Sequence, residues 1–422
     1  MSKTITTVLL GLYFFFYTVP QYINGYYYVY DRVVIQILIL STLNITTFLL
    51  LLKSNKLETI RDVFHRNYHT LSFALLIVIA FISIIVAKNK TEGIIVFSHF
   101  FTLFMSFVFI FILSQNKRIN FIKIFFYFTV TAIFLETTRT NWVIFDNVIT
   151  NGKVLIRSLD FRGFTGNINI SSFSIAIKLP VLIYLIFSIS SVLKRNILLI
   201  ILSSSILSIL LLFSRGAIIA VIIILLSTML FVFLNRRKSY FINLFLILIS
   251  CTISFISYEY INEKNTSDII IDRFSTVTDP ASDDSVNERQ NFYKIAIADI
   301  KNNPLLGVGL GNWKLTSIER ANKFLAGYRI PYRVHNDFLE ITAETGILGG
   351  ICFIYFIFYP FLFSLKKTLN TKEFKLSFLI FLIVGVYILD SLLNFPMHRP
   401  IIIVYLFFTF ALFYSAKNKQ LL

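Results

Sequence analysis

The sequence has few charged residues for its length. Asp, Glu, Lys and Arg make up only 14% of its 422 residues, whereas hydrophobic residues make up 56%. Soluble domains usually contain about 25% charged and 45–50% apolar residues. The composition therefore argues against a soluble enzyme and against a disordered chain, and it favours a protein with several membrane-spanning segments.

Cysteine is also scarce, and no cluster of metal-binding residues stands out. Cys251 and Cys352 both lie in apolar runs, where a buried small hydrophobic side chain is a better interpretation than a disulfide. No Cys or His spacing is typical of a zinc site, and there is no internal repeat. The sequence therefore gives no reason to expect a metal ion or another cofactor.

Twelve apolar runs are close to the length of about 20 residues that crosses a bilayer as a helix. The first, from Ile5 to Val19, follows a single Lys and has no small-residue cleavage site, so we interpret it as a retained helix rather than a signal peptide. We predict an all-α polytopic membrane protein with about 12 transmembrane helices. The runs cover approximately residues 5–23, 33–52, 71–87, 93–113, 119–137, 171–193, 197–213, 217–234, 241–257, 343–365, 376–393 and 400–416.

The distribution of positive charge predicts which face is cytoplasmic. The chain has 39 Lys and Arg against 22 Asp and Glu, a net charge of +17. With a cytoplasmic N-terminus, 19 basic residues fall in cytoplasmic segments and five in the short outer connections. Cytoplasmic loops collect Lys and Arg. We therefore predict that both termini are cytoplasmic, and this placement explains much of the basic excess without a nucleic-acid partner.

Most polar residues fall on the predicted outer face. A shorter loop is predicted from about Thr138 to Ile170, and a large one lies between spans 9 and 10. The chain then divides into transmembrane helices 1–9 (residues 1–257), the large loop (258–342) and transmembrane helices 10–12 (343–422). A loop of that length is usually functional. Its helical part is predicted from Asn287 to Asn303-Pro304, with one apolar face formed by Phe292, Ile295, Ala296 and Ile300.

Three alternate glycines follow that helix, at Gly307, Gly309 and Gly311. A nucleotide-binding loop is a poor interpretation, because no strand precedes them and they lie on the predicted outer face, away from ATP and NAD. Two interpretations remain. The segment is a tight turn where backbone packs on backbone, or it is a backbone cradle near a phosphate. We favour the tight turn.

Two cationic positions stand out at the predicted outer membrane boundary. Arg215 lies between two short apolar runs, where it either extends to lipid headgroups or binds an anion such as a diphosphate through its planar guanidinium. His335 lies among Arg, Asp and Glu residues just before the tenth span. A loop histidine is usually solvated, but this dense set of charges at the mouth of a bundle makes a functional site an equal alternative.

Three short motifs, taken in order, resemble a known family. They are Ser214-Arg215-Gly216, then Glu288-Arg289 with Pro304-Leu-Leu-Gly307-Val-Gly309, then His335-Asn336 with Glu344-Thr-Gly346-Ile-Leu-Gly349. The segment Gly163-Phe-Thr-Gly166-Asn167-Ile-Asn169 fits the same pattern. From about Gly163 to Pro400 the chain resembles the O-antigen ligase and polymerase superfamily of the bacterial inner membrane.

The resemblance implies a metal-independent, inverting glycosyltransferase of lipopolysaccharide biosynthesis that acts on the periplasmic face. Its donor would be an undecaprenyl-diphosphate-linked glycan, and its acceptor a hydroxyl of lipid A–core or of a growing glycan. Arg215 and Arg289 match the arginines that hold the donor diphosphate, and His335 matches the histidine that acts at the acceptor hydroxyl. Asn336, Glu344 and Arg333 are possible supporting residues.

Several alternatives stay open. Ligation of a finished polysaccharide and polymerisation of repeat units use the same chemistry, and no residue separates them. A protein O-oligosaccharyltransferase would belong to the same class. A lipid-glycan transporter is less favoured, because transporters more often show inverted repeats and helices broken at mid-membrane. The sequence does not predict the sugar, the linkage or the oligomeric state.

Overall fold

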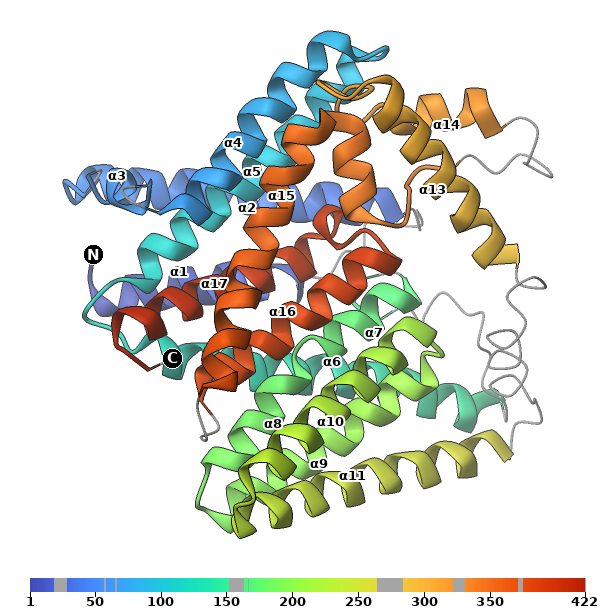
Figure 1. Ribbon diagram of the computed structural model, residues 1–422. Coiled ribbons are helices and arrows are strands. Elements are labelled where there is room, and N and C mark those ends of the chain that lie inside the picture. Colours follow the sequence, from blue (N-terminus) through green and yellow to red (C-terminus); the bar gives the residue numbers. More distant parts are fainter. Residues whose placement is uncertain are drawn as a thin grey trace.

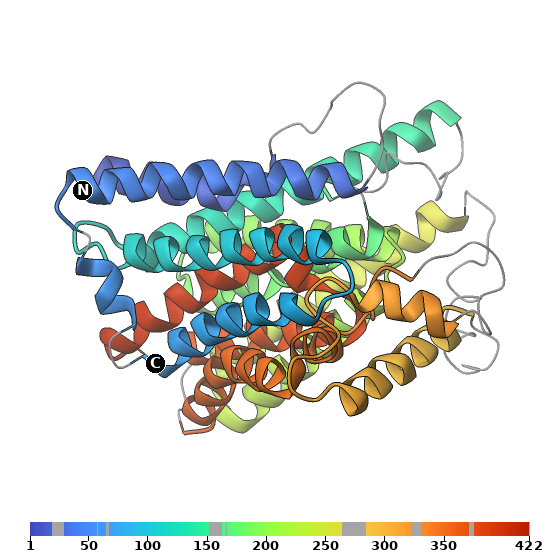
Figure 2. The same ribbon diagram turned by 90° about the horizontal axis from the view of Figure 1, so that it is seen from above.

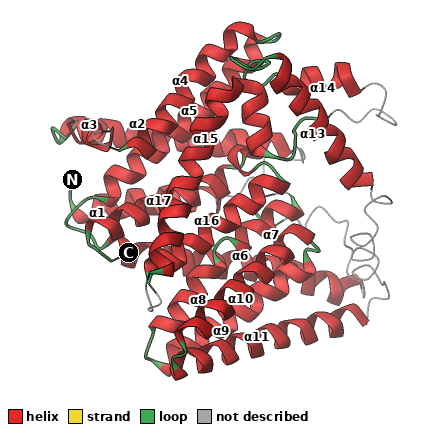
Figure 3. Ribbon diagram, viewed as in Figure 1, coloured by secondary structure: helices red, strands yellow, loops and turns green. Residues whose placement is uncertain are grey.

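The computed structural model describes residues 1–18, 29–56, 58–64, 67–151, 163–165, 167–263, 284–321, 331–370 and 375–421. Within these ranges the ordered elements are helices, and none of the residues forms a strand (Figure 3). The predicted all-α class is confirmed.

The first half of the chain contributes helices that mostly run the length of a bundle (Figure 1). They are α1 (Lys3–Phe15), η1 (Phe16–Thr18), α2 (Val29–Lys53), α3 (Glu58–Phe64), α4 (Tyr68–Ser83), η2 (Ile84–Val86), α5 (Lys90–Ser114), α6 (Phe121–Asn151), α7 (Ile168–Ala176), α8 (Leu179–Ser188) and α9 (Val192–Leu211).

The second half adds further helices, and two of them, α13 and α14, lie at one end of the bundle (Figure 2). They are α10 (Arg215–Asn235), α11 (Lys238–Glu263), α13 (Asp284–Asn302), α14 (Trp313–Ala321), α15 (Asp337–Leu369), α16 (Leu376–Leu393), η5 (Pro396–His398) and α17 (Pro400–Asn418).

Eleven helices among the described residues are long and apolar enough to cross a membrane. The predicted first span is helical only over α1 and η1 in those residues, which is shorter than a full crossing needs. Eleven of the twelve predicted runs therefore have a matching helix, and the count of twelve stays a prediction.

The sixth predicted span, residues 171–193, is not one helix but two. α7 ends at Ala176 and α8 begins at Leu179-Pro180, since proline favours the first turn of a helix over its interior. The buried side chain of Lys178 lies at this break, with its Nζ atom 3.0 Å from Oε1 of buried Glu136 on α6. A buried charge of this kind is tolerated because it is paired.

Two other boundaries differ from the sequence prediction. α6 continues to Asn151, well into the segment predicted as the shorter outer loop. α15 begins at Asp337, before the predicted start of span 10, and it is kinked at Gly346, where φ is 79°. Both differences have the same cause, because hydropathy marks only the apolar part of a helix and misses polar turns that extend beyond the membrane.

The helices give the bundle two distinct ends. The N- and C-termini lie at one end, and α13 and α14 lie at the other (Figure 2). α17 runs through the centre and is almost completely buried from Pro400 to Ala416. α2, α4, α5, α15 and α17 each run from one end towards the other, so they link the two ends directly (Figures 1 and 2).

Candidate active site

The site begins with α13, which packs on the start of α15. Phe292, Ile295 and Ala296 are buried on one face of α13, in a cluster that includes Trp313 and Ala343. The helix ends at Asn302, before Pro304. The predicted apolar face and the predicted helix end are both confirmed.

The glycine segment packs backbone against backbone on the kink of α15. The amide of Val308 donates to the carbonyl oxygen of Ala343 at 2.9 Å, and the amide of Ile347 donates to that of Pro304 at 2.9 Å. A Cβ atom at Gly307, where φ is 65°, would lie 2.3 Å from the Ala343 oxygen. The tight-turn interpretation of this segment is therefore confirmed.

Glu344 holds the end of this segment in place. Its buried carboxylate accepts a hydrogen bond from the amide of Trp313 at 3.1 Å. Next to Trp313, the side chain of Asn312 bonds the backbone of Asn89 in both directions, at 2.7 and 3.1 Å. Glu344 thus acts on the glycine segment, which in turn contacts the turn between α4 and α5.

The backbone of His335 is held in an unusual conformation, with φ of 60°. Left-handed φ values are uncommon outside glycine and cluster at functional sites. On one side, the amide of Val334 donates to Oε2 of Glu340 at 2.8 Å. On the other, Asn336 caps α15 by accepting from the amide of Leu339 at 3.1 Å. The conformation of His335 is therefore fixed by residues before and after it.

Tyr293 of α13 adds a third restraint. Its hydroxyl lies 3.2 Å from the carbonyl oxygen of His335 and 3.1 Å from that of Leu392, near the end of α16. The imidazole of His335 contacts the ring of Phe395, with centroids 5.1 Å apart. Three separate elements thus meet at this histidine.

Glu340 also joins the histidine segment to the turn before α17. Its Oε1 atom accepts from Nη1 of Arg333 at 2.7 Å, and Nε2 of His398 lies 3.1 Å from the same oxygen. Nη1 of Arg333 is 3.0 Å from Nε2 of His398. Burial, and next the charge of Arg333, lower the pKa of His398 to about 4, while Glu340 acts in the opposite direction. In the neutral ring Nε2 accepts from Arg333, which also donates to Glu340 and so bridges the two residues.

A cavity of about 750 Å³ opens beside these groups, and we call it the His335 cavity. It is lined by α2, α5, α13 and α14 together with the segments around His335 and His398. Its polar and charged lining residues are Glu92, His99, Glu288, Lys314, Tyr332, Arg333, His335, His398 and Arg399. The volume falls within the range of small-molecule sites.

Burial and the charges around the cavity keep His335 neutral. Burial, and next the charge of Arg289, lower the pKa of His335 to about 4, while Glu340 acts in the opposite direction. Nδ1 of His335 is buried and has no hydrogen-bond partner among the described residues. At neutral pH the imidazole is therefore uncharged and able to take up a proton.

The structure brings some predicted site residues together and separates others. His335 and Arg333 line the cavity, whereas Asn336 caps α15 and Glu344 holds the glycine segment. Arg289 is close enough to His335 to act on its pKa but is not one of the lining residues.

Arg215 is the half-buried first residue of α10. A Cβ atom at the neighbouring Gly216 would lie 3.1 Å from Leu393, at the end of α16. Because Tyr293 joins that end of α16 to His335, the start of α10 lies at the same end of the bundle. Arg215 is not among the residues that line the His335 cavity.

Several residues of the cavity are not among the site residues predicted from the sequence. Arg399 lines it, with its guanidinium 4.6 Å from the centre of the Phe395 ring, and Lys314 pairs with Glu92 there. Glu340 does not line the cavity, but it contacts Arg333, Val334 and His398 beside it, and the sequence did not predict it as a site residue either. A signal existed for it, since Asp337 and Glu340 are two acidic residues in the first turn of a helix that starts directly after His335-Asn336.

No three His, Cys, Asp or Glu side chains form a possible metal-binding group in the part of the chain that the structure describes. The reaction's independence from metal, expected from the resemblance, stays a prediction.

Comparison with known proteins agrees with the geometry. Residues 197–354 match a family model described as O-antigen ligase. The matched region contains Arg215, Arg289 and His335, and with them the glycine segment. No curated protein matches the chain. This central part of the chain is therefore similar to O-antigen ligases, whose family members are glycosyltransferase-like enzymes.

Proposed function

We propose that the protein transfers a glycan from an undecaprenyl-diphosphate carrier to an acceptor hydroxyl, as an O-antigen ligase does. The observation that carries the proposal is the position of His335. It lies within the family domain, with a constrained backbone, and lines a cavity that also contains Arg333 and Arg399.

The chemistry suits these groups. The acceptor oxygen attacks the anomeric carbon, the bond from that carbon to the diphosphate oxygen breaks, and the acceptor proton moves to the neutral imidazole of His335. The leaving diphosphate gains negative charge, which guanidinium groups stabilise through paired hydrogen bonds. Direct displacement of this kind inverts the anomeric centre.

Arg289 and Arg215 are the proposed donor-binding residues, and Arg333 and Arg399 extend the same positive field into the cavity. A bound diphosphate would offset the charge that Arg289 directs at His335, because opposite charges cancel at short range. The pKa of His335 should then rise on donor binding, which makes the histidine a stronger base when the donor is in place.

We propose that this end of the bundle faces the periplasm of a bacterial inner membrane, with both termini cytoplasmic. The charge bias of the loops supports this orientation. The helices that run between the two ends also suit it, because the termini and the His335 cavity lie at opposite ends.

Ligation to lipid A–core is the function we favour, and polymerisation of repeat units is the alternative. The experiment is a lipopolysaccharide gel from a strain in which the chromosomal gene carries His335→Ala, with analysis of undecaprenyl-linked glycans from the same cells. Lys194→Ala, an exposed cation on α9, is the matched control. Membrane levels of both variants are compared by immunoblot.

Bare core together with long glycan on the carrier is the expected result and means a ligase. Core that bears a single repeat unit would mean a polymerase instead. Wild-type lipopolysaccharide from the His335→Ala strain, at normal membrane levels, would contradict the role of His335.

A further inference from the structure

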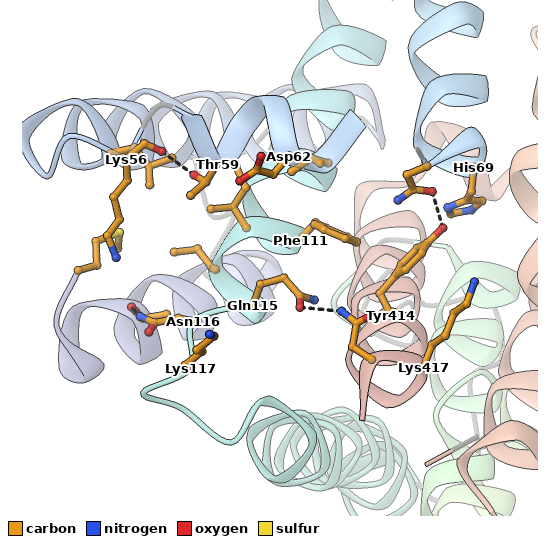
Figure 4. Close-up of a pocket in the computed structure, with 18 of the residues that line it drawn as sticks. Lys56, Thr59, Asp62, His69, Phe111, Gln115, Asn116, Lys117, Tyr414 and Lys417 are labelled. Carbon is orange, nitrogen blue, oxygen red and sulfur yellow. Dashed lines mark hydrogen bonds between the residues drawn. The ribbon is translucent and has the colours of Figure 1, made fainter. Parts of the chain in front are cut away.

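A second cavity lies at the end of the bundle that carries the termini. It has a volume of about 710 Å³ and is bordered by α3 and by the ends of α2, α5, α15 and α17 (Figure 4). We call it the basic cavity, because Lys56, Lys117, Arg118 and Lys417 line it. It is distinct from the His335 cavity, which lies at the other end of the same helices.

The charges in the basic cavity are almost all of one sign. Asp62 is the only carboxylate among its described lining residues. Within the described part of the chain, none of the four cations forms a salt bridge. Figure 4 shows Lys56, Lys117 and Lys417 on different sides of the space. Cations that surround a cavity without acidic partners create a field that favours an anion.

The rest of the lining is amphipathic. Four tyrosines, Tyr68, Tyr355, Tyr359 and Tyr414, line the cavity with apolar residues such as Leu51 and Leu113. The hydroxyl of Tyr414 donates to Oδ1 of Asn67 at 2.8 Å. Tyrosine is enriched where protein meets the boundary between hydrocarbon and headgroups. This lining suits a ligand with an anionic head and an apolar body.

The depth of the cavity agrees with that boundary. α5 has 25 residues and runs from Glu92 in the His335 cavity to Leu113 in the basic cavity. At 1.5 Å per residue it spans about 37 Å, slightly more than the hydrocarbon core of about 30 Å. If one cavity is at one face of the membrane, the other is therefore at the opposite face.

We propose that the basic cavity binds the phosphate headgroup of an anionic phospholipid from the surrounding leaflet. The general tendency of cytoplasmic loops to collect Lys and Arg accounts for their number at this end. It does not account for their arrangement around an amphipathic cavity with one carboxylate. Pockets of this type between transmembrane helices suit anionic lipid headgroups.

The test uses the full-length protein purified in detergent and titrated with phosphatidylglycerol, with bound lipid counted by native mass spectrometry. Phosphatidylcholine serves as the zwitterionic comparison. The test variant is Lys117→Gln/Arg118→Gln, and the matched control is Lys194→Gln/Lys238→Gln, which removes two exposed cations outside the cavity. Both variants lose the same net charge.

We expect wild type and control to retain phosphatidylglycerol over phosphatidylcholine, and the test variant to bind it roughly 10- to 30-fold more weakly. Equal losses in both variants would mean that net charge alone attracts the lipid, and would overturn the site. A further arm adds inorganic phosphate at millimolar concentration. Displacement of the lipid by phosphate would show that the site takes free phosphate, which would overturn a lipid as its ligand.

Discussion

The two ends of the bundle hold their charges in opposite ways. In the His335 cavity two of the cations contact carboxylates, Arg333 with Glu340 and Lys314 with Glu92. In the basic cavity, Lys117 and its cationic neighbours form no salt bridge among the described residues. Paired charges fix the geometry of the groups around them, whereas unpaired charges leave a field for a ligand to satisfy.

This difference separates two uses of charge in one molecule. A catalytic group must be held in place before the reaction, because preorganised polar groups stabilise the transition state without moving. A lipid headgroup is mobile and needs only an attractive field near the membrane surface. The pair formed by Glu136 and Lys178 is the extreme case of fixed charge, since both side chains are buried inside the bundle.

The largest effect on stability is expected at that interior pair. Lys178→Met leaves Glu136 buried without its cation, and breaking such a pair destabilises a protein by about 3–5 kcal/mol. The midpoint of unfolding in detergent should fall accordingly. Lys178→Met combined with Glu136→Gln should recover much of the loss, because no charge is then left unpaired. An unchanged midpoint for the single variant would show that the pair does not hold the break between α7 and α8.

The next effect is expected at Glu340, which positions His335 through Val334 and Arg333. Glu340→Gln should lower transfer about 100-fold, because displacement of a reacting group by about 1 Å has effects of that size. The control is Glu319→Gln, which removes an exposed carboxylate that pairs with Lys88. Equal activity of the two variants would contradict the positioning role.

The pH profile separates positioning from a general structural defect. Glu340 raises the pKa of His335. The acid limb of the pH–activity profile should therefore lie at lower pH in Glu340→Gln than in the wild-type protein. A merely unstable variant would lose activity without that shift.

A smaller effect is expected from Arg289 on the same profile. The lowered pKa of His335 predicts that wild-type kcat/KM falls near pH 4, rather than near the usual histidine value of about 6.5. Arg289→Gln should weaken donor binding. It should also move the acid limb to higher pH, because the positive charge of Arg289 in the wild-type protein disfavours the imidazolium form of His335. A limb at the same pH in both proteins would contradict the proximity of Arg289 to His335.

The same shift has a consequence for stability. The pKa of His335 is lower in the folded protein than in the unfolded chain. The contribution of His335 to the free energy of unfolding is therefore fully present above pH 6.5 and is lost as the pH falls towards 4.

The smallest effect on stability is expected in the basic cavity. Lys117→Gln should change the free energy of unfolding by no more than about 0.5 kcal/mol, because the side chain is exposed and forms no described ion pair. Chemical denaturation without added lipid measures this. A loss as large as that of Lys178→Met would mean that Lys117 is held by a structural contact, and the contrast between the two ends would fail.

The sequence was sufficient for the features that depend on local pattern. Hydropathy located the long helices, and the spacing of Phe292, Ile295 and Ala296 located the buried face of α13. The glycine segment was also predictable, because alternate glycines are needed where backbone meets backbone. His335 was identified from its position in a dense group of charged residues.

The remaining features depend on contacts between distant segments. The partner of Lys178 is 42 residues away, and hydropathy averaged over the run does not show that it contains a break between α7 and α8. Arg399 reaches the His335 cavity because the turn before α17 lies against the start of α15, where the amide of Met397 donates to Oδ2 of Asp337 at 2.8 Å. In the sequence, the basic residues around Lys117 predicted only which face of the membrane is cytoplasmic. The packed helices show that these residues surround a cavity.

The most direct test of the account is transfer measured with purified protein, a lipid-linked donor and lipid A–core. His335→Ala is compared with Lys117→Gln/Arg118→Gln at equal protein concentration in the same detergent. The account predicts that His335→Ala loses at least about 100-fold in rate, as expected for loss of a general base, while the double variant keeps its rate. Transfer by His335→Ala at the wild-type rate would contradict the assignment of catalysis to the end of the bundle that carries His335.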